Sequence, residues 1–74
     1  MDFEYYKNKA KSLGGNLRRK TYSIGTSVHV IAKDGTDVSS GSCYSKDFFE
    51  KYKEFFEIRN EMHEDKDFRK NYIC

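Results

Sequence analysis

Apolar residues recur at helical spacing near the start of the chain. Over residues 2–13 they are three and four positions apart, so they line one stripe of a helix: Phe3, Tyr6, Ala10 and Leu13. Asp2 can cap the first turn, and Gly14-Gly15 can end the helix in a left-handed turn. The pattern therefore predicts an amphipathic helix over residues 2–13.

The next part of the chain changes to the alternation that is typical of β-strands. Residues 17–24 form one predicted strand, Gly25 allows a turn or bulge, and residues 26–33 alternate between two faces of a second strand. If the first turn lies at Ile24-Gly25, one side of the sheet carries Arg18, Lys20, Tyr22, His29, Ile31 and Lys33.

Asp34-Gly35 is a strong hairpin signal, because a type I′ turn needs two residues that tolerate a positive φ. A two-residue turn there pairs Ile31 with Val38 and His29 with Ser40 in a third strand. Val38 and Ser40 would then complete the same side of the sheet. We expect this small, polar third strand to form an edge of the sheet.

The second half of the chain predicts a long helix and a short one. Ser45 can cap the long helix, and its apolar face consists of Phe48, Phe49, Tyr52, Phe55, Phe56 and Met62. After Met62 the stripe loses its phase, and a short helix is predicted from Asp65, with Phe68 and Tyr72 one turn apart. We expect Phe68 and Tyr72 to be core residues.

The order of these elements predicts a single small α+β domain over residues 1–74. It consists of an N-terminal helix, a three-stranded antiparallel sheet, a long helix and a short C-terminal helix (αβββαα) in two layers. The long helix would pack its phenylalanine face against one side of the sheet. The other side is open, or free to pair with a second copy of the chain.

Charge is distributed unevenly along the 74 residues, although the net charge is only +2. Residues 1–33 hold seven basic and two acidic side chains, whereas residues 34–74 hold seven and ten. Twelve residues are Phe or Tyr, which is too aromatic for a disordered tail. A basic N-terminal half can attract nucleic acid or the acidic face of a protein.

Composition also indicates where the protein works. The chain has no apolar run long enough to span a membrane and no signal peptide, so we expect a cytoplasmic protein with no membrane partner. Cys43 and Cys74 are too few for a disulfide framework, and their pairing stays open. The absence of Pro and Trp, together with many Lys, Asn, Tyr, Phe and Ile residues, suits an AT-rich bacterial or phage genome.

No motif in the sequence predicts catalysis. His29 and His63 are the only histidines, and neither lies in a recognisable catalytic motif. The two Cys and two His lack the spacing of a zinc site, and no Gly-Lys-Ser/Thr follows Gly14-Gly15. We therefore expect a protein that is not an enzyme and that has no cofactor or metal.

The open side of the sheet is the main candidate for binding. Cations interleaved with an aromatic ring suit a nucleic acid, because Arg and Lys bind phosphates while Tyr stacks on a base. The same side chains suit an acidic protein surface, where Arg and Tyr often dominate the energy. We expect Arg18, Arg19, Lys20 and Tyr22 to carry the affinity, supported by His29, Ile31 and Lys33.

Two families resemble this order of elements. The stretch "SGSCYSKDFFEKY" is similar to the lead into the last helix of double-stranded-RNA-binding domains, which implies that Ser45 and Lys46 touch RNA phosphates. Asp47 and Glu50 depart from that family, which usually has lysines there. The whole-chain order also resembles some phage-encoded anti-CRISPR proteins, which implies a compact inhibitor that occupies the surface of a nuclease.

We therefore expect a non-catalytic binding protein, a phage or bacterial accessory factor that blocks a larger protein or ribonucleoprotein. The alternative is a nucleic-acid-binding module that uses the basic N-terminal half. A second alternative is a structural protein that acts as a homodimer through the open side of the sheet or through its C-terminal end, with Ile31 or Tyr72 at the contact.

Overall fold

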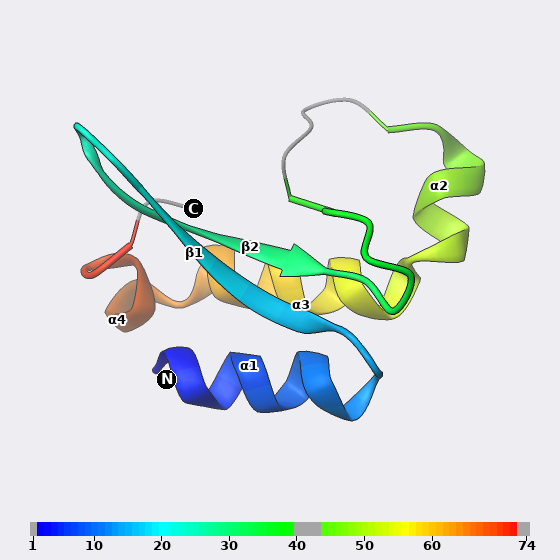
Figure 1. Ribbon diagram of the computed structural model, residues 1–74, viewed down its shortest axis with the longest axis horizontal. Coiled ribbons are helices and arrows are strands. Elements are labelled where there is room, and N and C mark those ends of the chain that lie inside the picture. Colours follow the sequence, from blue (N-terminus) through cyan, green and yellow to red (C-terminus); the bar gives the residue numbers. More distant parts are fainter. Residues whose placement is uncertain (1, 40–43, 73–74) are drawn as a thin grey trace.

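The computed structural model describes residues 2–39 and 44–72. Its elements are helix α1 (Phe3–Ser12), strands β1 (Asn16–Tyr22) and β2 (Gly25–Ile31), and helices α2 (Lys46–Lys51), α3 (Lys53–Glu64) and α4 (Lys66–Arg69). The β1–β2 sheet lies in front of α3, and α1 packs against both β1 and α3 (Figure 1). The α+β class is confirmed, but the described residues form two paired strands where three were predicted.

The first helix follows its sequence signals closely. Asp2 Oδ1 accepts a hydrogen bond from the Tyr5 backbone N–H at 3.0 Å, so Asp2 caps α1 as predicted. At the other end, Gly15 N donates to Ala10 O and Gly14 N donates to Lys11 O, both at 2.9 Å. This pair of bonds is a Schellman motif, and Gly14 supplies its left-handed residue with a φ of +86°.

The two strands pair through a loop that differs from the predicted one. Tyr22 opposes Gly25, so the loop is Ser23-Ile24, whereas a turn at Ile24-Gly25 would have opposed Tyr22 to Ser27. The difference is two positions, and side chains alternate between faces with a period of two. Arg18, Lys20, Tyr22, His29 and Ile31 therefore still share one side of the sheet.

The second turn differs from the predicted register by one residue. Gly35 N donates to Ala32 O, Ala32 N donates to Thr36 O, and Gly35 has a φ of +89°. Because no other residue of this turn has a positive φ, it is a three-residue loop and not a type I′ turn. Ile31 opposes Asp37, where Val38 was expected. Because of this one-residue shift in register, the Val38 side chain points into the core and is 0% exposed.

The predicted third strand is reduced to that one bridge between Ile31 and Asp37. Val38 N still donates a hydrogen bond to Val30 O. Val30 N, however, donates to the side-chain hydroxyl of Ser39 and not to a backbone carbonyl. Val38 O instead accepts from Tyr44 Oη, and Ser39 N donates to Asp37 Oδ1. Side chains have taken over the bonds of the ladder, which is how short polar residues end a strand. Ser40 lies outside the described residues.

The predicted long helix is interrupted at Tyr52. Ser45 Oγ caps α2 by accepting from Phe48 N, as expected, and α2 ends at Lys51. Tyr52 then has φ −112° and ψ 27°, so α3 begins as a separate helix at Lys53. Asp65 caps α4 by accepting from Phe68 N, which confirms the predicted short helix.

The core lies between the sheet and helices α1, α3 and α4. Val28 and Val30 point toward α3, and Phe68 is 1% exposed, as expected for a core residue. Tyr72 packs on the core through Phe3 and Phe68. Other buried members include Tyr6, Leu17, Phe55, Phe56, Ile58 and Met62. Ile73 and Cys74, like Cys43, lie outside the described residues.

Candidate functional site

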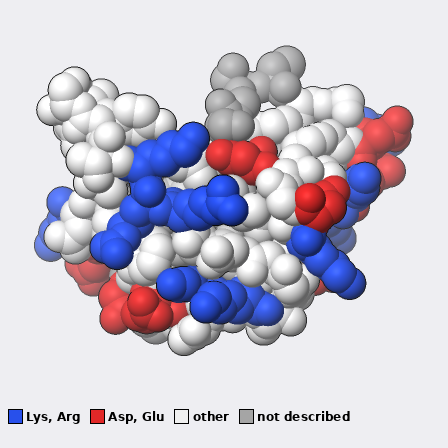
Figure 2. Space-filling view, in the orientation of Figure 1, with Lys and Arg blue, Asp and Glu red and all other residues white. Residues whose placement is uncertain are grey.

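The outer half of the β1–β2 hairpin extends away from the rest of the fold. Its loop stands clear of the helices in Figure 1, and every residue from Arg18 to Ile24 is exposed. Lys and Arg side chains gather over the sheet and α1 on this side of the molecule, and the tip of the hairpin projects beyond them (Figure 2). We call residues 18–24 the hairpin arm.

Arg18, Lys20 and Tyr22 are the exposed part of the predicted open side. They alternate along β1, so all three point away from α3. Arg18 opposes His29 and Lys20 opposes Ser27 across the hairpin. The Tyr22 ring is 49% exposed near the tip. These three predicted residues are brought together on one surface.

His29 and Ile31 share that side of the sheet but are buried, at 8% and 6% exposure. His29 Nε2 lies 3.1 Å from Ser27 Oγ, and Nδ1 lies 3.0 Å from Asp37 Oδ2 without the angle of a good hydrogen bond. The ring therefore joins β2 to the bridge at Asp37. Both residues support the base of the arm rather than present themselves to a partner.

Arg19 points to the opposite face of the sheet from Arg18 and Lys20. Its guanidinium lies 4.7 Å from the centroid of the Phe3 ring, and Lys7 Nζ lies 5.8 Å from the same centroid. Cation–π attraction holds both cations against the Phe3 ring of α1. Lys7 was not among the predicted site residues, although its place beside Phe3 extends the basic surface from the arm onto α1.

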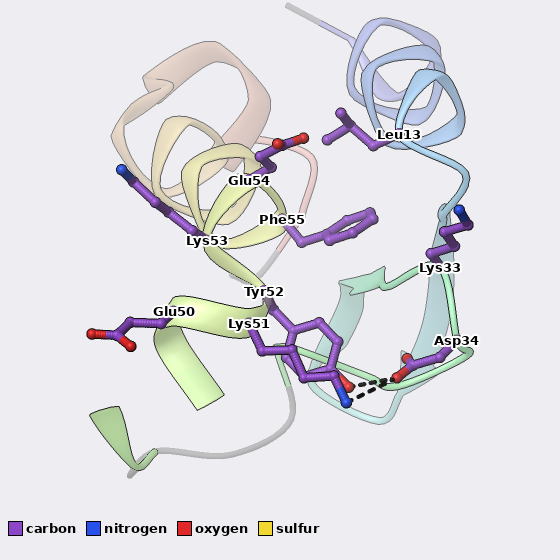
Figure 3. Close-up of a pocket in the computed structure, with 9 residues that line it drawn as sticks. All are labelled: Leu13, Lys33, Asp34, Glu50, Lys51, Tyr52, Lys53, Glu54 and Phe55. Atoms are coloured by element: carbon purple, nitrogen blue, oxygen red, sulfur yellow. Dashed lines mark hydrogen bonds and ion pairs between the residues drawn. The ribbon is translucent and has the colours of Figure 1, made fainter. Parts of the chain in front are cut away.

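Lys33 is separated from the other predicted residues. It lies in the turn after β2, where its side chain reaches Gly14: a Cβ at that glycine would lie 3.3 Å from Lys33 Cγ. Lys33 also lines an open groove of about 730 Å³ with Leu13 and Phe55 (Figure 3). It therefore belongs to a different surface from the hairpin arm.

The cations of the arm have no anionic partner within the described part of the chain. Residues 16–31 contain no Asp or Glu, and none of the ion pairs in the described residues involves Arg18, Arg19 or Lys20. By contrast, Lys9 pairs with Glu61, Lys51 with Asp34 and Lys70 with Asp67. The arm is thus a concentration of uncompensated positive charge.

The sequence pattern placed Ile24 at the end of the first strand or in the turn after it and not among the site residues, yet at 83% it is the most exposed large apolar residue of the described part of the chain. It occupies the second position of the Ser23-Ile24 loop, at the end of the arm. Loop residues are usually Gly, Asn, Asp or Ser. Isoleucine is therefore an unusual residue for this loop.

The groove beside Lys33 is built around a fixed carboxylate. Tyr52 Oη donates to Asp34 Oδ2 at 2.6 Å and Thr36 N donates to Asp34 Oδ1 at 3.0 Å, which lowers the pKa of Asp34 to about 2. Lys51 Nζ lies 4.0 Å from the same carboxylate, whereas Glu50 and Lys53 point outward (Figure 3). Asp34 therefore stays ionised at neutral pH and ties the turn to α2.

Two further titratable groups are perturbed by burial. Burial, followed by the hydrogen bond to Asp65, raises the pKa of Tyr6. Burial lowers the pKa of His63, and the nearby charges of Arg59 and Arg69 lower it further. Tyr6 joins α1 to the start of α4, and His63 lies in the last turn of α3. The bond from the Tyr6 hydroxyl to Asp65 therefore positions α1 against α4.

Among residues 2–39 and 44–72, no three His, Cys, Asp or Glu side chains gather as ligands of one metal ion. Within the same ranges, no helix is both long enough and apolar enough to cross a lipid bilayer.

Comparisons with protein families, characterised proteins and solved structures find no match to this chain. The family resemblances of the sequence therefore stay hypotheses. Both rest on an order of elements with a third strand, whereas residues 37–39 form a single bridge. Ser45 caps α2 and Lys46 begins it, away from the hairpin arm.

Proposed function

We propose that this protein is a non-catalytic binding protein that holds nucleic acid with its hairpin arm. The observation that carries the proposal is the set of three consecutive, exposed and uncompensated cations, Arg18, Arg19 and Lys20. Nucleic-acid affinity depends largely on Lys and Arg groups that displace the counterions of the phosphates. The arm itself, residues 18–24, carries no carboxylate that would repel those phosphates.

The shape of the arm agrees with this partner. It is a two-stranded antiparallel ribbon, whose backbones lie about 5 Å apart. Ribbons of this kind bind DNA in the major or the minor groove. Arg18 and Lys20, which share the face turned away from α3, can then meet phosphates along the groove.

A partner that adds a strand to the sheet is disfavoured by the same residues. β1 has one neighbour in the sheet, so its outer edge is a potential site of strand addition. Charged side chains on an edge strand oppose such pairing. The three cations of β1 therefore favour recognition by side chains over extension of the sheet.

A protein or ribonucleoprotein partner, which the protein would block in the manner of a small phage inhibitor, is the second candidate. Tyr22 and Ile24 favour it, because protein interfaces bury exposed aromatic and aliphatic side chains. This candidate uses the same arm, but its binding energy would come mainly from the tip and would depend less on salt.

Fluorescence anisotropy with labelled duplex DNA, duplex RNA and single strands tests the proposal. We expect binding by the wild-type chain that weakens with salt, with a slope of log K against log salt of about −0.9 per neutralised phosphate. The triple variant Arg18→Glu, Arg19→Glu, Lys20→Glu should lose this binding.

A matched control separates the arm from overall charge. Lys46, Lys53 and Lys66 each begin a helix, where a Glu side chain is favourable. Changing all three to Glu therefore preserves the fold and gives the protein the same net charge as the triple variant of the arm. We expect the control to bind nearly as well as the wild type. Equal loss in both triples would contradict the proposal. Failure of the wild-type chain to bind any nucleic acid at low salt would leave the protein partner.

A further inference from the structure

The tip of the hairpin arm presents an apolar side chain that the fold does not use. Ile24 is 83% exposed, and its neighbours along the chain, Ser23 and Gly25, have no apolar side chain that could cover it. Neither Ser23 nor Ile24 has a positive φ, while Gly25 has φ 148°, so the glycine absorbs the unusual backbone of the loop. The loop is thereby free to carry a β-branched residue at its end.

The chemistry of the tip differs from that of a platform for single strands. Proteins that bind single strands without sequence preference stack successive bases on aromatic rings. Here the outermost side chain is aliphatic and has no π-face, and its branching at Cβ leaves it few conformations. A stiff aliphatic group is instead the kind of side chain that wedges between two base pairs of a duplex.

The charges behind the tip fit the same arrangement. Lys20 and Arg18 lie on one side of β1 behind the loop, spaced by about 7 Å along an extended strand. They can hold the phosphates that border a groove while the tip reaches the bases. Duplex DNA is the fitting partner, because wedges of this kind enter a base step from the minor groove of DNA.

We propose that the partner is duplex DNA and that Ile24 enters a base step and kinks the duplex. This inference rests on the proposed function of the arm, since the cations must first hold the DNA. Pyrimidine–purine steps should be preferred, because they unstack most easily. Wedges of this kind bend DNA by about 20–90°.

The test measures bending and binding separately. A short DNA duplex with a central TA step carries a donor and an acceptor fluorophore at its two ends. We expect the wild-type protein to raise energy transfer between the ends. Ile24→Ala should abolish this rise while the salt slope of binding stays unchanged, because the cations are intact. Ile24 is exposed, so its replacement leaves the fold in place.

Ile24→Val, which keeps the branched wedge, is the matched control and should retain most of the bend. Bending by Ile24→Ala equal to that of the wild type would overturn the wedge. Wild-type binding without bending, or tighter binding to single strands than to duplex, would overturn the inference and leave the proposed function standing. Absence of any DNA binding at low salt would contradict both the wedge and the proposed function.

Discussion

At the scale of single residues, the clearest effect is the fixing of Asp34 by its neighbours. Tyr52 and Thr36 hydrogen-bond its carboxylate, and Lys51 lies within 4.0 Å. These contacts favour the ionised form, which is why the pKa of Asp34 falls from 3.8 to about 2. The residue that signalled a turn in the sequence thus also joins that turn to the helical half of the chain.

Replacement of Asp34 by Asn should change the acid sensitivity of folding. Because the pKa of Asp34 is lower in the folded state, its contribution to stability is complete above about pH 3.8 and is lost as pH falls toward 2. The difference in unfolding free energy between wild type and Asp34→Asn should therefore shrink over that range. Urea unfolding of both proteins between pH 6 and pH 2 measures it, and a constant difference would contradict the assignment.

At the scale of elements, the helix break at Tyr52 divides a continuous apolar pattern into two units of unequal burial. None of the residues of α2 is buried, whereas α3 buries Phe55, Phe56, Ile58 and Met62. The Tyr44 ring stacks on Phe48 and contacts Phe56, and Tyr52 is fixed through its hydroxyl. α2 is therefore held in place by aromatic contacts and by the hydrogen bond of the Tyr52 hydroxyl.

Tyr52→Phe should loosen α2 selectively. The ring stays in place, so the packing of α3 is preserved, but the hydrogen bond to Asp34 is lost. We expect the backbone amides of α2 to exchange with deuterium roughly threefold to tenfold faster, as for the loss of one ordinary hydrogen bond. Amides of α3 from Ile58 onward serve as the internal control. Equal acceleration in both helices would show that this hydrogen bond stabilises the whole fold.

At the scale of the whole molecule, α1, the sheet and α3 meet at Gly15. A Cβ at this position would lie 2.2 Å from Ile31 O and 2.4 Å from Cε1 of Phe55. Both distances are far shorter than the van der Waals contacts of a carbon atom, and a backbone oxygen cannot move as a flexible side chain can. These elements can pack this closely because Gly15 has a hydrogen atom where other residues have a Cβ.

Gly15→Ala should therefore destabilise the protein by about 1–3 kcal/mol, the usual cost of overpacking. For a domain of this size that corresponds to a fall in melting temperature of about 4–8 °C per kcal/mol. Gly35→Asn is the matched control, because no atom lies within 4 Å of a Cβ there and Asn tolerates its positive φ. Thermal unfolding followed by circular dichroism measures both variants, and equal melting temperatures would contradict the role of Gly15.

The candidate binding surface could be predicted in part from the sequence. Arg18, Lys20 and Tyr22 do share an exposed face, because an error of two positions in the turn leaves side-chain alternation unchanged. Arg19 and Lys33 were predicted with the others, but Arg19 lies on the opposite face of the arm against Phe3, and Lys33 lies beside the groove. The exposure of Ile24 could not be predicted, because a pattern shows that a residue is apolar and not whether anything covers it.

The sequence by itself determined the local features of this protein. Asp2, Ser45 and Asp65 cap helices because their side chains bond backbone N–H groups only three residues away. The tertiary structure alone decided the slip that buries Val38 and the loss of the third strand. Those outcomes depend on contacts between distant residues, such as Tyr44 with Val38 and Tyr52 with Asp34, which compete with the local preferences of the chain.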